Sequence, residues 1–222
     1  MSETAAIANL QSQSADHYFT NDRANMLAYL PAQTHALLDV GCSAGGFGAL
    51  VKRERGAEVW GIEYQPAVAE TAKARLDRVF AGDVAEILPT LPDAYFDCVT
   101  FNDVLEHLVN PYQVLLDTAR LLKPGGYIVC SIPNLRYYKV MIELLFKKDF
   151  QYRDFGVLDK THLRFFTQKS IRRMFEDLGY AVERLEGING TRAPLFFLFN
   201  ALFLGGLSDM RYLQFACVVR RK

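Results

Sequence analysis

Two stretches of the sequence combine residue types that could do chemistry, and the first is a glycine-rich loop. Residues 37–48 read LLDVGCSAGGFG, an apolar run followed by Asp39 and four glycines. Glycines let a ligand approach the backbone closely, and the free N–H groups of a following helix can bind an anionic part of it. Glu63 lies 22 residues past Gly41, where a carboxylate can accept hydrogen bonds from both hydroxyls of a ribose. This pattern alone fits NAD and an adenosyl ligand equally.

The second stretch places two acids and a histidine after the apolar run 96–102. If residues 103–108 turn helically, Asp103 and His107 lie on one side, because they are four residues apart. The candidates for a catalytic general base are Asp103, Glu106 and His107, and His107 is the first choice because an imidazole titrates near neutral pH and can take a hydroxyl proton. His162, in DKTHLRFFT, is the second candidate. The alternative is that Glu106 and His107 only cap and brace the wall of a crevice.

Metal binding is not expected from these residues. Asp103, Glu106 and His107 would be three neighbouring ligands without a distant fourth, which is a poor cage. None of the four histidines has another at helical zinc-ligand spacing. The four cysteines, Cys42, Cys98, Cys130 and Cys217, are widely spaced and are expected to be reduced, buried thiols.

The elements that would hold these residues alternate between strand and helix. The expected strands cover residues 36–40, 58–63, 78–83, 96–102 and 127–133, with helices between them that begin near Gly46, Pro66 and Pro111. Such alternation favours a mostly parallel sheet covered on both faces, a doubly wound α/β fold. In such sheets the ligand lies outside the carboxyl ends of the strands, where the strand order reverses.

The last third of the chain departs from this alternation. Residues 134–166 contain no clean strand and are interpreted as an insertion. A helix from Thr167 to the Gly179 cap follows, and residues 181–188 and 212–220 predict an antiparallel strand pair at the sheet edge. We therefore expect one domain over residues 31–222, preceded by a leader and lid helix in residues 1–30.

Composition limits the class of protein. The chain has 222 residues, 50% of them hydrophobic, and a formal net charge of zero. A protein that coats nucleic acid usually has a basic surplus, so a nucleic-acid partner is not expected. Because the sequence does not open with a charged and then apolar signal segment, a cytoplasmic location is expected.

Taken in order, several motifs resemble those of the class I S-adenosylmethionine-dependent methyltransferases. They are LLDVGCSAGGFG, GIEY, AGDV, FDCVTFNDVLEHLVNP and ARLLKPGGYIVCSIPN, and the resemblance covers residues 35–185. It implies a seven-stranded Rossmann-like fold, S-adenosylmethionine as methyl donor and S-adenosylhomocysteine as product. The implied cofactor-binding residues are Asp39, Gly41, Cys42, Ser43, Gly45, Glu63, Tyr64, Asp83, Val84 and Asn102. Among them, Glu63 would hold the ribose, and Asp83 and Val84 would flank the adenine.

Within that class, DVLEHL and DKTHLRFFT are most similar to a broad group that contains the ubiquinone-biosynthesis O-methyltransferases and many sugar and natural-product methyltransferases. This favours a small-molecule or glycan acceptor methylated at oxygen. Residues 136–173 hold ten Lys or Arg against four Asp or Glu, a surplus of six that could attract an anionic acceptor. The resemblance also implies that the insertion 134–166 folds over the acceptor pocket. The expected acceptor-binding residues are Arg164, Tyr138 and Phe165.

The apolar segment 193–207, APLFFLFNALFLGGL, allows three interpretations. It is too short for a membrane span and could be buried in the fold or a dimer interface, dock on lipid, or line a pocket for an apolar acceptor. Burial in the fold or between subunits is the favoured interpretation.

Two rival functions stay open. Ser43 stands where the family usually has glycine, which leaves room for a non-catalytic member that only binds the cofactor. An NAD-linked oxidoreductase is the remaining rival.

Overall fold

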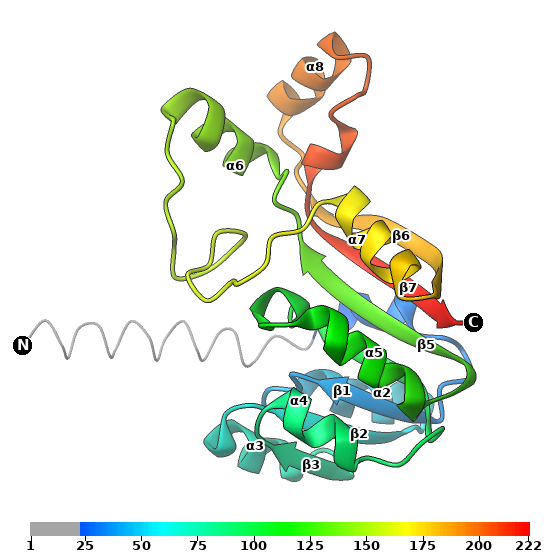
Figure 1. The fold of residues 1–222 in the computed structure, drawn as a ribbon. Helices are drawn as coiled ribbons and strands as arrows, with labels where there is room; N and C mark the ends of the chain where they lie inside the picture. Colours follow the sequence, from blue (N-terminus) through cyan, green and yellow to red (C-terminus); the bar gives the residue numbers. More distant parts are fainter. Residues whose placement is uncertain (1–22) are drawn as a thin grey trace, which may run out of the picture.

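A seven-stranded sheet forms the centre of the computed structural model, which describes residues 23–222 (Figure 1). The strand order is β3-β2-β1-β4-β5-β7-β6. The strands are β1 (Ala36–Val40), β2 (Glu58–Glu63), β3 (Arg78–Ala81), β4 (Phe96–Asn102), β5 (Leu122–Pro133), β6 (Tyr180–Gly190) and β7 (Tyr212–Arg221). Pairing is parallel from β3 to β5, and β7 runs antiparallel to both of its neighbours. The predicted doubly wound, mostly parallel fold with an antiparallel C-terminal pair is confirmed.

The central position of β1 in the sheet explains why its sequence is mostly apolar. All five residues of β1 are buried, because helices cover both faces of a parallel sheet. β1 pairs with β2 on one side and with β4 on the other. The strand order therefore reverses between β1 and β4, and the crevice at their carboxyl ends is the expected ligand site of an open α/β sheet.

Two apolar clusters, one on each face of the sheet, form the core. On one face, alternate residues of β1 such as Leu38 and Val40 pack with Leu115 and Phe175. On the other face, Leu37 packs with side chains that include Met26, Phe47, Val51 and Ala72. The first cluster joins the sheet to α4 (Val84–Ile87), η2 (Leu88–Thr90), α5 (Pro111–Leu121) and α7 (Gln168–Asp177), and the second joins it to η1 (Ala24–Tyr29), α2 (Gly46–Arg55) and α3 (Pro66–Lys73).

Local signals set the ends of several helices. Thr167 caps α7 in a reciprocal capping box with Ser170, and Asn110 caps α5 just before Pro111. Gly56 ends α2 in the left-handed conformation, where a glycine has no steric penalty. Two elements are shorter than their sequence patterns predict. The helix predicted over residues 66–76 is α3, which ends at Lys73, and the strand predicted over 78–83 is β3, which ends at Ala81. Only part of the predicted leader and lid helix can be compared, because residues 1–22 lie outside the described residues.

The insertion between β5 and α7 forms a small satellite structure. It contains α6 (Tyr138–Ile142), continued by the π-helical turn η4 (Glu143–Lys147), and then an irregular segment that returns to α7. Val140, Val157 and Leu158 form a separate buried cluster inside it. Figure 1 shows α6 standing beyond the carboxyl end of β5, so the returning segment passes over the crevice side of the sheet.

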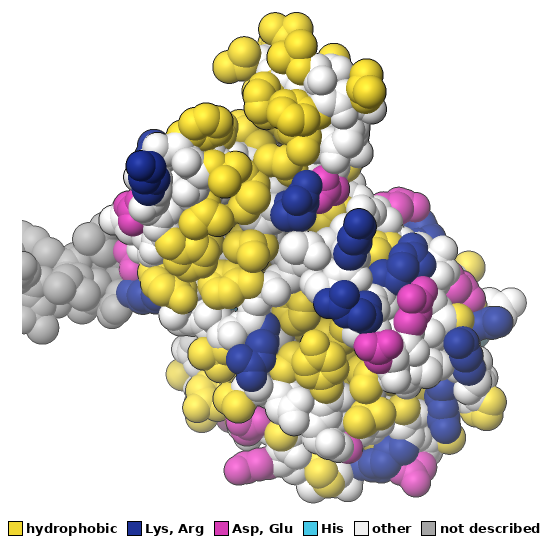
Figure 2. Space-filling model, turned by 45° about the horizontal axis from the view of Figure 1, so that its top comes forward, with side chains coloured by type: hydrophobic (Ala, Val, Ile, Leu, Met, Phe, Trp, Pro, Cys, Tyr) yellow, Lys and Arg dark blue, Asp and Glu magenta, His cyan; other side chains and the backbone are white. Residues whose placement is uncertain are grey.

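The apolar segment 193–207 is not buried within the fold, which contradicts one of the two forms of burial expected for it and leaves burial in a dimer interface as a prediction. It forms α8 (Pro194–Leu202) and a following turn before η5 (Ser208–Arg211). Phe196 is the one buried residue of α8, whereas Leu195 is 76% exposed and Leu204 is 97% exposed. Figure 2 shows hydrophobic side chains gathered over α8 and over the neighbouring α6 region. Among the described residues, no helix has the length and apolar character needed to cross a membrane.

Candidate active site

A deep cleft of about 1390 Å³ lies at the carboxyl ends of the central strands. Its floor includes Gly41 and Glu63, which follow β1 and end β2. Asp103 and His107, beyond β4, line it, and His162 of the insertion closes it from the other side. Residues predicted from separate motifs are therefore brought to one cavity, as the topology of the sheet requires.

The glycine loop lies against the cleft at Gly41. This residue has a φ of +71°, and a Cβ on it would lie 2.5 Å from Cγ2 of Val104, so no other residue fits. Gly45 and Gly48 serve packing instead: a Cβ on Gly48 would lie 2.5 Å from Leu76, and Gly45 contacts the same side chain. Such glycines can contact a ligand or allow close packing of a helix on a strand, and close packing is the role that the structure displays for these two.

Glu63 is almost fully buried and joins the glycine loop to the cleft. One carboxylate oxygen accepts a hydrogen bond from the backbone N–H of Ser43 at 2.9 Å, and the other accepts one from the N–H of Gln65 at 2.9 Å. Each carboxylate oxygen has a further lone-pair site, so two positions stay available to ribose hydroxyls. The side chain is thus fixed in place before a ligand arrives.

The adenine side of the cleft is formed after β2 and β3. Asp83 caps α4 by accepting a hydrogen bond from the N–H of Ala85 at 2.8 Å, and Val84 follows it in the wall. Tyr64 also lines the cleft and is 73% exposed. An exposed ring at this edge can cover a planar base, which agrees with the placement implied by the resemblance.

Three of the predicted cofactor residues lie behind the cleft wall. Asp39 is buried and accepts a hydrogen bond from Thr100 at 2.7 Å. Cys42 and Asn102 are buried as well, and neither lines the cleft with its side chain. Burial raises the pKa of Asp39 to about 6, because the charged form loses its hydration.

The raised pKa of Asp39 predicts a stability that depends on pH. An unfolded aspartate loses its proton near pH 4, whereas the folded one holds it until about pH 6, so the free energy of unfolding falls as pH rises through this window. Two pKa units correspond to about 3 kcal/mol. We expect Asp39→Asn to abolish this decline and to be more stable than the wild type at pH 7.5, measured by urea unfolding at several pH values.

Asp97 supplies the control of opposite sign. Burial alone would raise its pKa, but hydrogen bonds from Lys123 and from the N–H groups of Ala36 and His35 outweigh burial and lower it. Asp97→Asn should therefore lose stability above pH 4. An Asp39→Asn variant with the same pH profile as the wild type would contradict the assignment.

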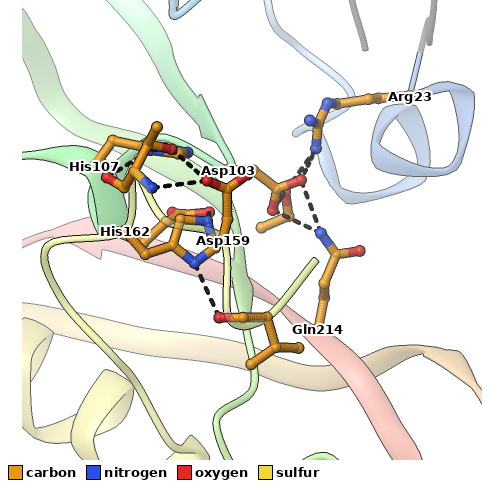
Figure 3. Close-up of polar contacts among 10 residues, drawn as sticks. Arg23, Asp103, His107, Asp159, His162 and Gln214 are labelled. Carbon is orange, nitrogen blue, oxygen red and sulfur yellow. Dashed lines mark hydrogen bonds and ion pairs between the residues drawn. The ribbon is translucent and has the colours of Figure 1, made fainter. Parts of the chain in front are cut away.

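Asp103 is held by three partners rather than free to act as a base. Its carboxylate accepts hydrogen bonds from Gln214 at 2.7 and 2.8 Å and from Ser131 at 2.9 Å, and it pairs with Arg23 (Figure 3). The predicted helical turn over 103–108 is confined to η3 (Leu105–His107), because Asp103 has a φ of +53°. Its side chain consequently points to β5 and β7 and fixes the loop after β4.

Glu106, His107 and His162 converge on the other side of the same loop. One potential ligand atom from each of the three lies within 4.8 Å of the others. The two imidazole rings meet edge to face with their centroids 4.7 Å apart, and Nε2 of His162 lies 4.0 Å from Glu106. The insertion is held here by its own backbone, since the N–H groups of Leu163 and Arg164 donate to the carbonyl of Glu106.

The electrostatics of this group differ from those of a surface cluster. Burial raises the pKa of Glu106 well above its ordinary value, and the nearby charge of Asp103 raises it further. Burial also lowers the pKa of His107, with His162 adding to the effect. Neither carboxylate oxygen of Glu106 has a hydrogen-bond partner among residues 23–222. A fully buried carboxyl group without a partner is costly and calls for an explanation.

The structure does not bring the predicted acceptor-binding residues to the cleft. Arg164 donates to the carbonyl of Val109 at 2.6 Å and is exposed. Tyr138 stacks on Phe196 of α8, and Phe165 packs in the apolar cluster of the insertion. None of the three is among the lining residues.

Ion pairs engage part of the positive charge of the insertion. Arg136 pairs with Asp209, which lies outside residues 136–173, whereas Arg153 and Lys160 pair with Glu143 and Asp154, two of the four acids already counted in the surplus. These contacts weaken the argument for an anionic acceptor, which rested on the surplus alone.

Several site residues were absent from the predicted set. Gln214 reaches Asp103 from β7, 111 positions further along the chain, and no local signal in YLQFACVVR marks it. From the sequence, Glu106 is only a base candidate behind His107, a brace of the crevice wall or one of three neighbouring metal ligands, and its burial beside both histidines is visible only in the structure. Thr161, in the same motif as His162, contacts the ring of His107 through its carbonyl and hydroxyl oxygens.

Comparison with known proteins agrees with this geometry. Residues 13–185 match the family described as a methyltransferase domain. The ubiquinone biosynthesis O-methyltransferase of Maricaulis maris is 36% identical over 109 residues, which are 47% of this chain and 42% of that protein. The demethylmenaquinone methyltransferase of Staphylococcus aureus is 28% identical over 177 residues, 71% of this chain and 73% of that protein. The match to the first of these relatives thus spans less than half of its length.

A solved structure extends the similarity to the fold. The S-adenosylmethionine-dependent methyltransferase from Archaeoglobus fulgidus superposes with a TM-score of 0.69 at 20% identity, over 89% of this chain and 92% of that one.

The sheet and its cleft define a Rossmann-like methyltransferase domain, and the chain belongs to the methyltransferase domain family. The cofactor of this domain is S-adenosylmethionine, which decides between the two ligands that the glycine loop alone could not distinguish.

Proposed function

We propose that this protein transfers the methyl group of S-adenosylmethionine to a hydroxyl oxygen of a small, largely neutral acceptor. In this reaction the bond between the methyl carbon and sulfur breaks, a bond from that carbon to oxygen forms, and the hydroxyl proton leaves. The observation that supports oxygen as the acceptor atom is the group of Glu106, His107 and His162 at the wall of the cleft, because a hydroxyl acceptor must lose a proton.

The cofactor has a defined place in this proposal. Glu63 binds the ribose, Asp83, Val84 and Tyr64 surround the adenine, and the loop of Gly41 and Ser43 receives the methionyl part. The sulfonium then lies near the carboxyl end of β4. The methyl group is already activated, so the remaining tasks of the protein are alignment and exclusion of water.

The charge of the cleft favours a neutral acceptor over an anionic one. Its lining includes the carboxylates of Glu63, Asp83, Asp103, Asp154 and Asp159, against the cations Arg23 and Lys160, while the raised pKa of Glu106 favours its neutral form. Such a surface repels anions. Apolar side chains such as Val104, Leu108 and Phe155 also line the cleft, so we infer an acceptor with an apolar part. The two named relatives are a ubiquinone biosynthesis O-methyltransferase and a demethylmenaquinone methyltransferase by their titles, which is compatible with an apolar acceptor.

Labelled S-adenosylmethionine provides the test. The protein is incubated with the labelled cofactor and a panel of phenols, polyols, amines and sugar nucleotides, and label transfer is followed together with release of S-adenosylhomocysteine. We expect transfer to neutral hydroxyl compounds. Transfer only to amines, or only to phosphorylated sugars, would contradict the proposal, and cofactor binding without transfer to any acceptor would favour a non-catalytic member.

We further propose that the apolar surface of α8 and the α6 region contacts a lipid bilayer. Exposed side chains include Leu145, Phe146, Leu198 and Leu202. The same region carries Lys139 of α6, Lys147 of η4 and Lys148 directly after it, and this combination is typical of a surface that lies at an anionic membrane. A homodimer is the alternative that the same surface would allow.

A vesicle experiment separates these two partners. The protein should co-sediment with phosphatidylserine-containing vesicles, and the double variant Leu198→Glu/Leu202→Glu should lose at least half of that binding, because charges replace buried apolar area. Glu70→Ala on the far helix α3 is the control. A dimer that dissociates in the double variant, with no vesicle binding by the wild type, would contradict lipid contact; light scattering measures the mass.

A further inference from the structure

The two histidines beside Glu106 are oriented by the backbone of the insertion. Nδ1 of His162 lies 3.0 Å from the carbonyl oxygen of Val157. Nδ1 of His107 lies 3.3 Å from the carbonyl oxygen of Thr161. Because a carbonyl can only accept, each Nδ1 donates its hydrogen, and the lone pair of each neutral ring is placed on Nε2. This is the arrangement found in metal-binding histidines, whose second nitrogen is fixed by a carbonyl or carboxylate.

Glu106 supplies the third group. Its side chain is 1% exposed, and neither oxygen accepts a hydrogen bond within residues 23–222. The carboxylates of Asp103 and Asp159 add negative charge in its neighbourhood, whereas Arg23, the nearest counter-charge, is already engaged with Asp103. A positively charged ligand at this point would satisfy an otherwise unpaired buried acid.

We propose that Glu106, His107 and His162 form a binding site for a divalent transition-metal cation. Bond lengths of about 2.0–2.2 Å to such a cation require the three ligand atoms, now within 4.8 Å, to draw together by roughly 1 Å, which side-chain rotation can provide. Two imidazoles and one carboxylate suit Zn²⁺, Fe²⁺, Co²⁺ or Mn²⁺ better than Mg²⁺ or Ca²⁺, which prefer oxygen ligands.

The distant ligand that the sequence did not reveal is His162. It comes from the insertion, 55 positions beyond His107. It supplies the distant ligand that was missing when only the neighbouring residues 103–107 were considered as metal ligands. Three protein ligands leave coordination positions open toward the cleft, as in sites that bind a substrate oxygen.

This inference rests on the proposed function for its role in the reaction. A bound cation would accept the oxygen of the acceptor hydroxyl and favour loss of its proton to water, since a metal lowers the pKa of a coordinated hydroxyl. The oxygen would then be both held in place and made more nucleophilic. In this role the histidines act as ligands, and the Asp103 carboxylate keeps the loop in position.

Cobalt binding tests the site independently of activity. The full chain, treated with chelator and dialysed, is titrated with CoCl₂ while visible absorption is recorded. We expect saturation at one Co²⁺ per chain. Glu106→Gln and His162→Gln should each weaken binding by more than about 100-fold, because loss of an outer-shell partner alone costs 10–100-fold. The control is His35→Gln, which alters an exposed histidine outside the cleft.

Two further measurements keep the result interpretable. Calorimetry with S-adenosylhomocysteine shows whether each variant is folded, and in the wild type Zn²⁺ should shift the NMR signals of His107 and His162 but not of His35. Absence of saturable Co²⁺ binding, or equal binding by wild type and both variants, would overturn the site. Methyl transfer to a hydroxyl by a chain that binds no Co²⁺ would leave the proposed function intact, whereas Co²⁺ binding without any transfer would count against the function alone.

Discussion

Replacing Glu63 by alanine is expected to weaken S-adenosylmethionine binding about 5- to 150-fold. The range corresponds to about 1–3 kcal/mol, the scale for losing hydrogen bonds to a charged group. The carboxylate has two tasks in the structure, since it receives ribose hydroxyls and also holds the N–H groups of Ser43 and Gln65. Its loss therefore removes contacts to the ligand and loosens the loop that must lie beneath it.

Two comparisons separate these tasks. Glu63→Gln keeps the size and one acceptor oxygen but loses the charge, so we expect an intermediate loss of affinity, measured by calorimetry. Glu70→Ala, on the exposed side of α3 where Glu70 pairs with Lys73, is the matched control and should bind the cofactor normally. Unchanged affinity of Glu63→Ala would remove Glu63 from the site.

The second large effect is expected at His107. His107→Ala should lower kcat by about 10²- to 10⁴-fold, the usual contribution of a group that assists proton removal, while the dissociation constant of S-adenosylmethionine changes less than about twofold. Cofactor affinity should change little because His107 lines the cleft beyond β4, away from the contacts of Glu63 and Asp83. Turnover and cofactor binding must be measured on the same preparation, because the contrast between them is the result.

His35→Ala serves as the control for this experiment, since His35 is exposed and its contact to Asp97 uses the backbone N–H. A His107→Ala variant with full turnover would show that this histidine only braces the cleft wall. A parallel loss of turnover and cofactor affinity would indicate a displaced loop instead, because η3 and Gly41 meet through Val104.

Two different parts of the protein form the walls of the cleft. In the proposed arrangement the cofactor side depends on β1 to β3, where backbone groups and two acids are fixed before a ligand arrives. The proposed acceptor side depends on the insertion, which reaches the cleft through Asp159 and His162 and is anchored by the carbonyl of Glu106. Differences in acceptor among proteins of this fold can therefore arise in the insertion without altering the cofactor side.

Much of the fold and the cofactor side could be predicted from the sequence because their signals are local. The apolar runs that became β1, β2 and β4 matched within a residue, and Thr167 and Pro111 marked helix starts through capping and a fixed φ. Glu63 and Asp83 could be placed because strand ends of a parallel sheet meet at one edge. These positions follow from chemistry within a few residues.

The tertiary structure alone decided which distant side chains meet. His162 approaches Glu106 because the insertion folds back over the cleft, and Gln214 reaches Asp103 because β7 inserts beside β5. It also left α8 exposed, although its composition predicted burial. The physical reason is the same in each case: local sequence determines the conformation of a segment and its apolar face, but the surface that meets it depends on how remote segments pack.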